Sequence, residues 1–302
     1  MQRKPEWLKV RVAGGAGLRS VRSRLTARGL HTVCDEARCP NRGECFGRGN
    51  ATIMVLGKVC TRGCRFCSVS TGQRLAPLDP GEPGAVAAAV AELGLRYVVL
   101  TMVTRDDLPD GGAAAVAACI AAVKQRHPGV GVELLGSDFG GDRRALAVVA
   151  AAGADVLAHN IEVVRRLTPL VRHSRCSYGR SLAVLRALGE LTEPAGTPIK
   201  SSLLLGLGET HEEVGETLED LRHAGVSLVT LGQYLQPARG CWPVVEYLAP
   251  ERFAGYVRIG RHLGFTSVVA GPLVRSSYGA EEQHRVAQQL GAAAAGAGEG
   301  GR

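Results

Sequence analysis

Short apolar runs recur along the chain from residue 51 onward, and glycine, proline or polar residues separate them. Seven runs have the length and the Val, Ile and Leu content of buried strands: 51–57, 97–103, 130–136, 154–160, 198–206, 227–233 and 265–271. Most are separated by Ala- and Leu-rich stretches with helical spacing, such as 83–93, 182–191 and 211–224. Continuous apolar strands that alternate with helices predict an α/β protein with a parallel sheet covered by helices.

Six or seven βα units could close, or nearly close, into a barrel with its functional residues at the carboxyl ends of the strands. An open doubly wound sheet is the alternative, and the periodicity does not separate the two. In either case, polar or cysteine-rich segments follow the strands: 58–67, 104–107 (TRDD), 159–160 and 206–209 (GLGE). The tail from residue 291 (GAAAAGAGEGGR) is low in complexity, and we expect it to be disordered.

Composition and the lengths of the apolar stretches indicate where the protein is found. Of the 302 residues, 45% are hydrophobic, which is enough for a sizeable core. The longest apolar stretch, 113–123, is about half of the roughly 20 residues that a membrane helix needs. The first ten residues, MQRKPEWLKV, lack the apolar region of a secretory signal. We therefore expect a cytoplasmic enzyme that does not span a membrane.

The formal net charge of +8 is concentrated in residues 1–33, which hold eight Lys or Arg residues and one acidic residue. A solvated arm would explain this charge, and so would a surface for an acidic protein or a nucleic acid. Because no aromatic residues are interleaved with the basic ones, we expect no nucleic-acid partner. An acidic protein is the favoured partner.

The chain has nine cysteines, and six of them fall between residues 34 and 67. Disulfides are rare in reducing compartments, so this clustering indicates metal or redox chemistry. The remaining three, Cys119, Cys176 and Cys241, have no partners at cluster spacing. Cys119 lies in an apolar helical stretch and is expected to be a small core residue.

The first group is Cys60, Cys64 and Cys67, with the spacing CxxxCxxC on a loop that leaves a strand. Three thiolates can bind three irons of a cubane cluster and leave the fourth iron open. A chelating substrate can occupy such an open position, as water does at an open zinc site. A structural zinc site would need a fourth ligand, and the nearest histidine, His31, is well upstream.

This motif resembles the CxxxCxΦC signature of the radical S-adenosylmethionine superfamily, in which Φ is aromatic and is Phe66 here. The resemblance implies a partial (β/α)6 barrel. It also implies that S-adenosylmethionine chelates the open iron and is cleaved by one electron to methionine and a 5′-deoxyadenosyl radical, which abstracts hydrogen from a strong C–H bond. The protein would position the cofactor and exclude water.

The second group is Cys34, Cys39 and Cys45, with the spacing CxxxxCxxxxxC. On spacing alone these residues could bind a second cluster, bind zinc with one ligand missing, or be unrelated. The first motif begins fifteen residues later, which favours a second cluster.

The segment HTVCDEARCPNRGECF, followed by ATIMVLGKVCTRGCRFC, is similar to the lipoyl synthase family. In that family the second triad binds an auxiliary 4Fe–4S cluster, whose remaining iron takes a serine from a C-terminal RSSY motif. This chain has RSSY at 275–278, and we assign the ligand to Ser277, although spacing does not exclude Ser276.

The resemblance implies a reaction and its partners. A protein-bound octanoyl group, amide-linked to a lysine of a lipoyl carrier domain, receives sulfur at C6 and C8. The auxiliary cluster is the sulfur donor and is consumed. An electron donor such as ferredoxin or flavodoxin would reduce the first cluster.

The resemblance also divides the chain into three parts. Residues 1–50 form a basic arm and the auxiliary-cluster segment, 51–274 the radical barrel, and 275–302 a C-terminal segment with RSSY and a disordered tail.

Further segments extend the similarity: 100–112, 159–162, 203–210 and 230–237. Gly206, Gly208 and Glu209 are expected to shape the adenosylmethionine site, although GLGE alone would be an ordinary turn. Asn160 and Glu162 could hydrogen-bond the ribose or methionyl moiety, or only cap a helix. Arg105, Asp106 and Asp107 could line the cavity or form a surface ion-pair loop, and the direction of the Lys200 side chain is open.

The chain departs from the usual pattern at a few positions. Gly63 replaces a frequent arginine, Cys176 lies in an unusual segment, and Cys241-Trp242 stands where a histidine–leucine pair is usual. None of these changes removes a cluster ligand. The alternatives are another radical sulfur-inserting enzyme with a different acyl or vitamin precursor, and a non-catalytic two-cluster electron carrier.

Overall fold

A computed structural model describes residues 3–9, 16–36, 39, 41, 44–45, 52–73 and 75–299 of the chain. Its main sheet has eight strands in the order β1-β2-β5-β6-β7-β8-β9-β10. The strands are β1 (His31–Thr32), β2 (Thr52–Val55), β5 (Tyr97–Met102), β6 (Gly131–Leu135), β7 (Val156–Ala158), β8 (Ile199–Leu205), β9 (Leu228–Gln233) and β10 (Ser267–Gly271). Strands β3 (Val59–Cys60) and β4 (Ser70–Thr71) form a separate small ladder.

All neighbouring strands from β2 to β10 are parallel, and only β1 is antiparallel to its neighbour. The seven predicted strands are therefore confirmed. Strands β1 and β10 are the two edges of the sheet, so the barrel is partial. The sheet decides the alternative left open by the sequence in favour of a partial barrel over a doubly wound sheet, because its strands follow one another in chain order with no switch point.

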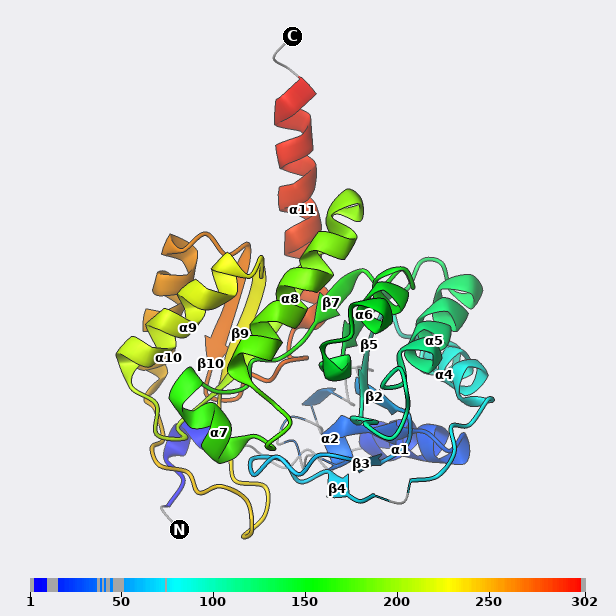
Figure 1. Cartoon of the computed structure of the whole chain (residues 1–302), viewed down its shortest axis with the longest axis horizontal. Helices are drawn as coiled ribbons and strands as arrows, with labels where there is room; N and C mark the ends of the chain where they lie inside the picture. Colours follow the sequence, from blue (N-terminus) through cyan, green and yellow to red (C-terminus); the bar gives the residue numbers. More distant parts are fainter. Residues whose placement is uncertain are drawn as a thin grey trace.

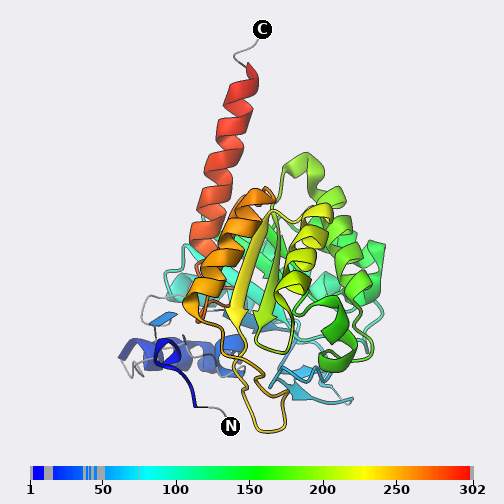
Figure 2. The same ribbon diagram turned by 90° about the vertical axis from the view of Figure 1, so that its left-hand side faces the viewer.

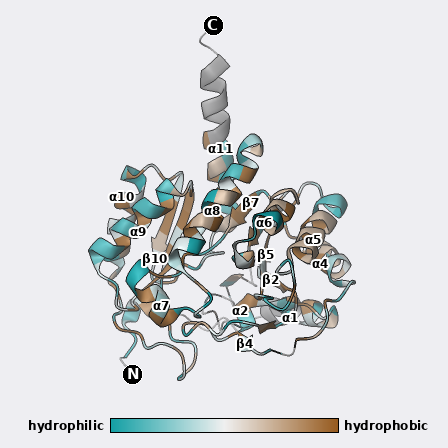
Figure 3. Ribbon diagram, viewed as in Figure 1, coloured by the Kyte–Doolittle hydropathy of each residue, from teal (hydrophilic) through white to brown (hydrophobic). Residues whose placement is uncertain are grey.

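The helices are α1 (Ala16–Ala27), α2 (Val33–Glu36), α4 (Glu82–Glu92), α5 (Ala113–Arg126), α6 (Arg143–Ala150), α7 (Thr168–Val171), α8 (Tyr178–Thr192), α9 (His211–His223), α10 (Pro250–His262) and α11 (Ala280–Glu299). Helices α4, α5, α6, α8, α9 and α10 lie along the outer face of the sheet, whereas α1 and α2 lie by the carboxyl ends of the strands (Figure 1). Hydrophilic residues gather on the outward sides of α9 and α10, whereas the strands are hydrophobic (Figure 3). The helices bury one apolar stripe each, as amphipathic helices do.

A side-chain cap fixes the start of α9. Helix α9 begins with a capping box, in which the Thr210 hydroxyl accepts from the Glu213 N–H and the Glu213 carboxylate accepts from the Thr210 N–H. Cys119 is fully buried in α5, which confirms its expected place in the core.

The carboxyl ends of the strands face the cysteine loop and the N-terminal segments, while α11 projects in the opposite direction (Figure 2). Helix α11 continues to Glu299, so the structure differs from the disordered tail expected from residue 291. Alanine has the highest helix propensity, and it offsets the glycines in this stretch. No helix of the described residues is long and apolar enough to cross a membrane.

Lys200 points into the barrel rather than toward solvent. Its Nζ lies 2.9 and 3.1 Å from the two carboxylate oxygens of Glu133 on β6, and both side chains are almost fully buried. The Tyr97 hydroxyl donates to the same carboxylate at 3.2 Å. Buried charges persist when they are paired and hydrogen-bonded, so this cluster is part of the barrel core.

Candidate active site

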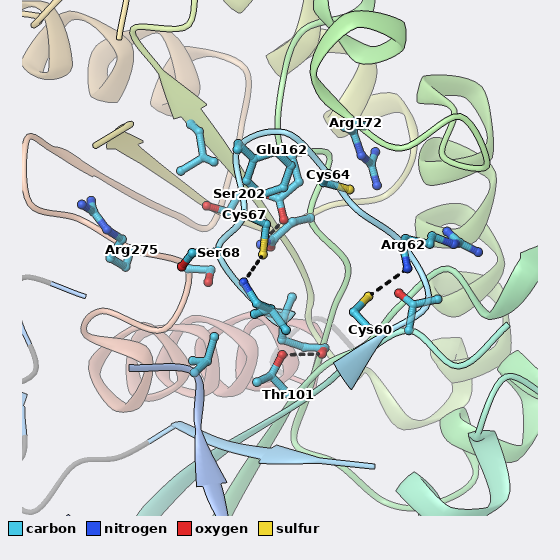
Figure 4. A pocket seen from close by; sticks show the side chains of 18 of the residues that line it. Cys60, Arg62, Cys64, Cys67, Ser68, Thr101, Glu162, Arg172, Ser202 and Arg275 are labelled. Atoms are coloured by element: carbon cyan, nitrogen blue, oxygen red, sulfur yellow. Dashed lines mark hydrogen bonds between the residues drawn. The ribbon is translucent and has the colours of Figure 1, made fainter. Parts of the chain in front are cut away.

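A cavity of about 510 Å³ opens at the carboxyl ends of the strands. All three cysteines of the first group line it, and so do Phe66, Asn160 and Glu162. The loop that carries Cys60, Cys64 and Cys67 runs across the cavity wall, with Glu162, Ser202 and Arg172 around it (Figure 4). The structure thus brings together six of the residues that the sequence predicted for this site.

Each sulfur of the first group accepts one backbone N–H. Arg62 donates to Cys60 Sγ at 3.4 Å, and Val69 donates to Cys67 Sγ at 3.5 Å. The third donor comes from another part of the chain, because the N–H of His173 lies 3.4 Å from Cys64 Sγ. Hydrogen bonds to the sulfurs are one of the ways in which a protein stabilises and tunes an iron–sulfur cluster.

Arg62, between the first two cysteines, anchors the loop to the barrel. Its guanidinium makes four hydrogen bonds of 2.7 to 2.9 Å, two to Asp106 after β5 and two to Asp138 after β6. The hydrogen bonds with Arg62 lower the pKa of Asp106 to about 2. The two bidentate ion pairs, with Asp106 and Asp138, are buried or nearly buried, and they fix the loop relative to the sheet.

Cys176, one of the departures from the usual pattern, lies beside Cys64. Its Sγ is 3.5 Å from a guanidinium nitrogen of Arg62. A hydrogen bond with Cys64 lowers the pKa of Cys176 to about 5, and the charges of Arg172 and Arg62 act in the same direction. The same hydrogen bond, together with burial, raises the pKa of Cys64. Burial raises the pKa of Cys67 to about 11, and the positive charge of a bound cluster iron would favour the thiolate forms of Cys64 and Cys67.

Asn160 and Glu162 both face the cavity. The Asn160 amide donates to the Glu162 carboxylate at 3.1 Å, and burial raises the pKa of Glu162. Glu162 has a φ of +66°, a conformation that a side chain of this kind rarely adopts. Backbone strain of this kind is often found at ligand sites.

His159 forms a buried link behind these residues. Its Nδ1 donates to the Gly136 carbonyl at 3.1 Å, so Nε2 accepts from the Ser181 hydroxyl at 3.0 Å. Arg172 donates to the same hydroxyl at 2.9 Å. Burial, followed by the charge of Arg172, lowers the pKa of His159 to about 4, so the ring is neutral.

The turn Gly206–Glu209 lies outside the residues that line the cavity. The Glu209 carboxylate accepts from the backbone N–H groups of Gly206 and Leu207 and so closes its own turn. Gly206 has a φ of +94°, and a Cβ there would lie 2.3 Å from the Glu246 carbonyl oxygen, so only glycine fits. The strand before this turn contributes Ser202 and Leu204 to the cavity instead.

The second cysteine group lies next to the first. Ser68 donates from its hydroxyl to the Glu36 carbonyl at 2.7 Å, which ties the end of the first loop to helix α2. Burial, followed by the nearby charges of Cys39 and Cys45, raises the pKa of Cys34 to about 12. Neighbouring thiolates repel one another, and a bound cation would relieve that repulsion.

The C-terminal motif meets the same region from the other end of the chain. Asn41 donates from its amide to the Leu273 carbonyl at 2.6 Å, although 232 positions separate the two residues. Arg275 and Ser276 line the cavity, and Cys39 is close enough for its charge to act on Arg275. Ser277 follows directly in the turn but is not among the lining residues.

The donor sets fit iron–sulfur clusters. Each group supplies three cysteine sulfurs, and a 4Fe–4S cluster takes one ligand per iron. In the part of the chain that the structure describes, no three His, Cys, Asp or Glu side chains converge tightly enough for a single metal ion. The serine-bearing turn approaches both groups, since Arg275 and Ser276 line the cavity of the first group and Cys39 of the second group is close to Arg275.

Comparison with known proteins decides the family. The Radical SAM superfamily profile matches residues 54–221, and that of the N-terminal domain of lipoyl synthase matches residues 1–39. The chain is 54% identical to lipoyl synthase of Halorhodospira halophila, over 93% of this chain and 83% of that one. It is 50% identical to mitochondrial lipoyl synthase of Aedes aegypti, over 93% and 72%. The chain belongs to the lipoyl synthase family.

Solved structures agree on the fold. Methylornithine synthase superposes with a TM-score of 0.55 at 18% identity, over 81% of this chain and 73% of that one. The hydrogenase maturase HydG from Carboxydothermus hydrogenoformans gives a TM-score of 0.55 at 16% identity, over 77% and 56%. At these identities the likeness concerns the radical SAM barrel alone.

Membership of the lipoyl synthase family makes this chain a radical SAM enzyme, and its cofactors are 4Fe–4S clusters and S-adenosylmethionine. The expected family, fold class and cofactors are thus confirmed. Sequence analysis did not identify Arg62, Asp138 or Arg172 as site residues. A signal was available, because Asp106 and Asp138 each follow a predicted strand and the two strands are neighbours. Two acids at neighbouring strand ends indicate a buried cation between them, which is Arg62 here.

Proposed function

We propose that this enzyme inserts two sulfur atoms, at C6 and C8, into an octanoyl group amide-linked to a lysine of a carrier protein. One observation carries the proposal. A single cavity is lined by Cys60, Cys64 and Cys67 and also by Arg275 and Ser276, which belong to the segment that contacts the second cysteine group. The radical source and the sulfur source therefore face one space.

The residues divide the work between them. Cys60, Cys64 and Cys67 hold a cluster whose open iron binds S-adenosylmethionine, and this pair supplies the 5′-deoxyadenosyl radical for hydrogen abstraction. Cys34, Cys39, Cys45 and Ser277 hold the sulfur-donating cluster. We assign the serine ligand to Ser277 because its neighbour Ser276 faces the radical cavity. An oxygen ligand in place of a thiolate suits a cluster that has to come apart.

The cavity wall suits an acyl chain and a polar cofactor at once. Met54, Val69 and Leu204 supply apolar surface, and Asn160 and Glu162, which follow β7, supply hydrogen-bonding groups. Apolar walls keep water away from a reactive radical, which is the main protection a protein can give. Phe66, Gly206, Gly208 and Glu209 support the cofactor site through the loop and turn that they belong to.

The partners follow from the same proposal. The substrate is an octanoylated lipoyl carrier protein, and the basic residues of 1–33 suit an acidic carrier. A ferredoxin or flavodoxin would supply electrons, and the compartment would be the cytoplasm. Residues 1–50 and 275–302 would act together on the auxiliary cluster, and 51–274 on radical formation.

The test uses anaerobically reconstituted enzyme, S-adenosylmethionine, a reductant and an octanoyl-lysine peptide. We expect about eight irons per chain and a peptide mass gain that corresponds to two sulfurs. Cys64→Ala should abolish 5′-deoxyadenosine formation. Cys39→Ala should retain cleavage of S-adenosylmethionine and lose sulfur insertion, because it disturbs only the second cluster.

Two outcomes would count against the proposal. A stable content near four irons in the wild-type chain would remove the auxiliary cluster. Lipoyl product from Cys39→Ala would show that the sulfur comes from elsewhere. Cys119→Ala is the matched control, because this cysteine is buried in α5 away from both groups.

A further inference from the structure

Trp242 connects the first cysteine loop to two other segments. Its backbone N–H donates to the Arg65 carbonyl at 2.6 Å, and its indole Nε1 donates to the Leu207 carbonyl at 3.1 Å. Its own carbonyl accepts from the Tyr234 hydroxyl at 2.7 Å. Arg65 also stacks on the indole, with its guanidinium carbon 4.5 Å from the ring centroid.

The contacts of Trp242 meet the site at separate points. Arg65 lies inside the cysteine loop, next to Cys64. Leu207 belongs to the turn after β8, and Tyr234 begins the stretch 234–237 that forms one wall of the cavity. The Trp242 indole therefore joins the loop that carries the cluster to the turn after β8, and the Trp242 backbone joins the same loop to Tyr234 in the cavity wall.

The neighbouring residues reinforce this connection. The Cys241 thiol lies 3.5 Å from the Cys67 carbonyl, and the Gln236 amide donates to the Cys241 carbonyl at 2.7 Å. On the other side of the loop, the Arg65 N–H donates to the Val171 carbonyl at 2.7 Å. The loop is thus fixed from both sides, and the Cys241-Trp242 pair supplies one of them.

We propose that Trp242 is a positioning residue that sets the position of the first cluster relative to the 234–237 wall of the cavity. Its indole holds Arg65 of the cysteine loop against the turn after β8, and its backbone carbonyl accepts from Tyr234 in the wall. The proposal rests on the proposed function, since it assumes that the cysteine loop binds a cluster with an open iron. A ligand that binds this iron and extends along the cavity touches both segments, so its affinity depends on their separation. Leucine, the usual residue at this position, has no indole N–H to donate to Leu207.

The test is a variant series in the reconstituted enzyme. Trp242→Phe keeps an aromatic ring for Arg65 and loses the Nε1 donor, and Trp242→Leu loses both. Val245→Ala is the matched control, because Val245 lies in the same connection and is half exposed. Iron content and Tm are measured for each variant, together with the Kd for S-adenosylmethionine and the change that its binding causes in the EPR spectrum of the reduced cluster.

A second readout uses the scarcity of tryptophan. Trp7 and Trp242 are the two tryptophans of the chain, and Trp7 is exposed in the N-terminal segment. In a Trp7→Phe background, fluorescence reports Trp242 alone. We expect its emission to change when the cluster is assembled and again when S-adenosylmethionine binds, because the indole contacts the loop directly.

For Trp242→Phe we expect normal iron content and Tm, with a Kd for S-adenosylmethionine raised about 2- to 10-fold, which is the equivalent of one hydrogen bond. Trp242→Leu should raise it further and should alter the EPR change. If both variants match Val245→Ala, or if Tm and iron fall in parallel with affinity, the positioning role is wrong. A wild-type enzyme that binds no S-adenosylmethionine would instead overturn the proposed function itself and remove the basis of this one.

Discussion

The first cysteine group is built into the barrel wall, whereas the second lies where the two ends of the chain meet. Each sulfur of the first group accepts a backbone N–H, and Arg62 ties its loop to two strand ends. The segment of the second group is joined to the barrel by the pairing of β1 with β2, by the burial of Cys34 in the core, and by the Ser68–Glu36 and Asn41–Leu273 hydrogen bonds. The difference suits their proposed roles, since one cluster has to survive every turnover and the other is consumed.

Among the predictions, substitution of Arg62 should reduce stability and 5′-deoxyadenosine formation the most. Arg62 anchors the loop of the first group and has no contact with the second in the described residues. Arg62→Ala removes the two hydrogen bonds of the buried Asp138 to its nearest cation and leaves it only the more distant Arg180, at 3.7 Å, and the Gly140 N–H. We expect the free energy of unfolding to fall by about 3 kcal/mol. Formation of 5′-deoxyadenosine should fall at least about 10-fold, because the cluster loop loses its fixed position. Urea unfolding and a single-turnover assay measure the two effects.

Arg143→Ala is the control for this variant. Arg143 pairs with Glu190 at 2.8 Å on the surface, where both side chains are well exposed, so its loss should cost less than about 1 kcal/mol. Equal effects of the two substitutions would show that the buried fork is no stronger an anchor than a surface pair.

Lowering the pH should reduce the free energy of unfolding, because His159 is buried as a neutral ring. Its pKa is lowered to about 4 in the folded state, against about 6.5 in an unfolded chain. The stability that this neutral ring contributes is therefore present above pH 6.5 and is lost as the pH falls from 6.5 toward 4. The slope is at most about 1.4 kcal/mol per pH unit, roughly 3 kcal/mol in total.

His159→Gln should remove this part of the pH dependence, because glutamine does not titrate. Urea unfolding of both proteins at pH 7, 6 and 5 measures the difference between the slopes. Parallel curves for the two proteins would mean that His159 is already protonated in the folded state or contributes nothing.

A smaller effect is expected from Asn41, which tests the second group. Asn41→Ala removes one hydrogen bond and leaves the Leu273 carbonyl without this donor, at a cost of about 1–2 kcal/mol. We expect a chelator to remove iron from the second cluster faster, with the first cluster as the internal control. Asn41→Asp, which places an acceptor against the carbonyl, should act in the same direction and more strongly. Release of both clusters at the same rate would contradict the comparison.

The sequence predicted the parts of this structure that depend on local patterns. Seven strands followed from apolar runs, and Cys60, Cys64 and Cys67 followed from spacing that a loop can satisfy by itself. The resemblance supplied the role of the second group and of Ser277, which spacing alone left open.

Contacts between distant segments were not predictable in this way. Lys200 stands between Ile199 and the pair Ser201-Ser202, so no alternation of apolar and polar residues shows that its side chain points inward to Glu133. Cys176 and Trp242 read as isolated departures, and only the folded chain shows both against the cysteine loop. The sequence of a short loop does not indicate which strand ends will surround the loop in the folded chain.

The Asn41–Leu273 contact also has a consequence for the order in which the protein is synthesised and assembled. It links segments next to β1 and β10, the two edges of the sheet, so it bridges the gap that hydrogen-bonded strands leave open. At a translation rate of about 5–20 residues per second, roughly 10 to 50 s pass between synthesis of Asn41 and of Leu273. The cysteines of the second group therefore emerge from the ribosome long before Ser277. On the proposed ligand set, the second cluster gains its last ligand only after the whole barrel has been made.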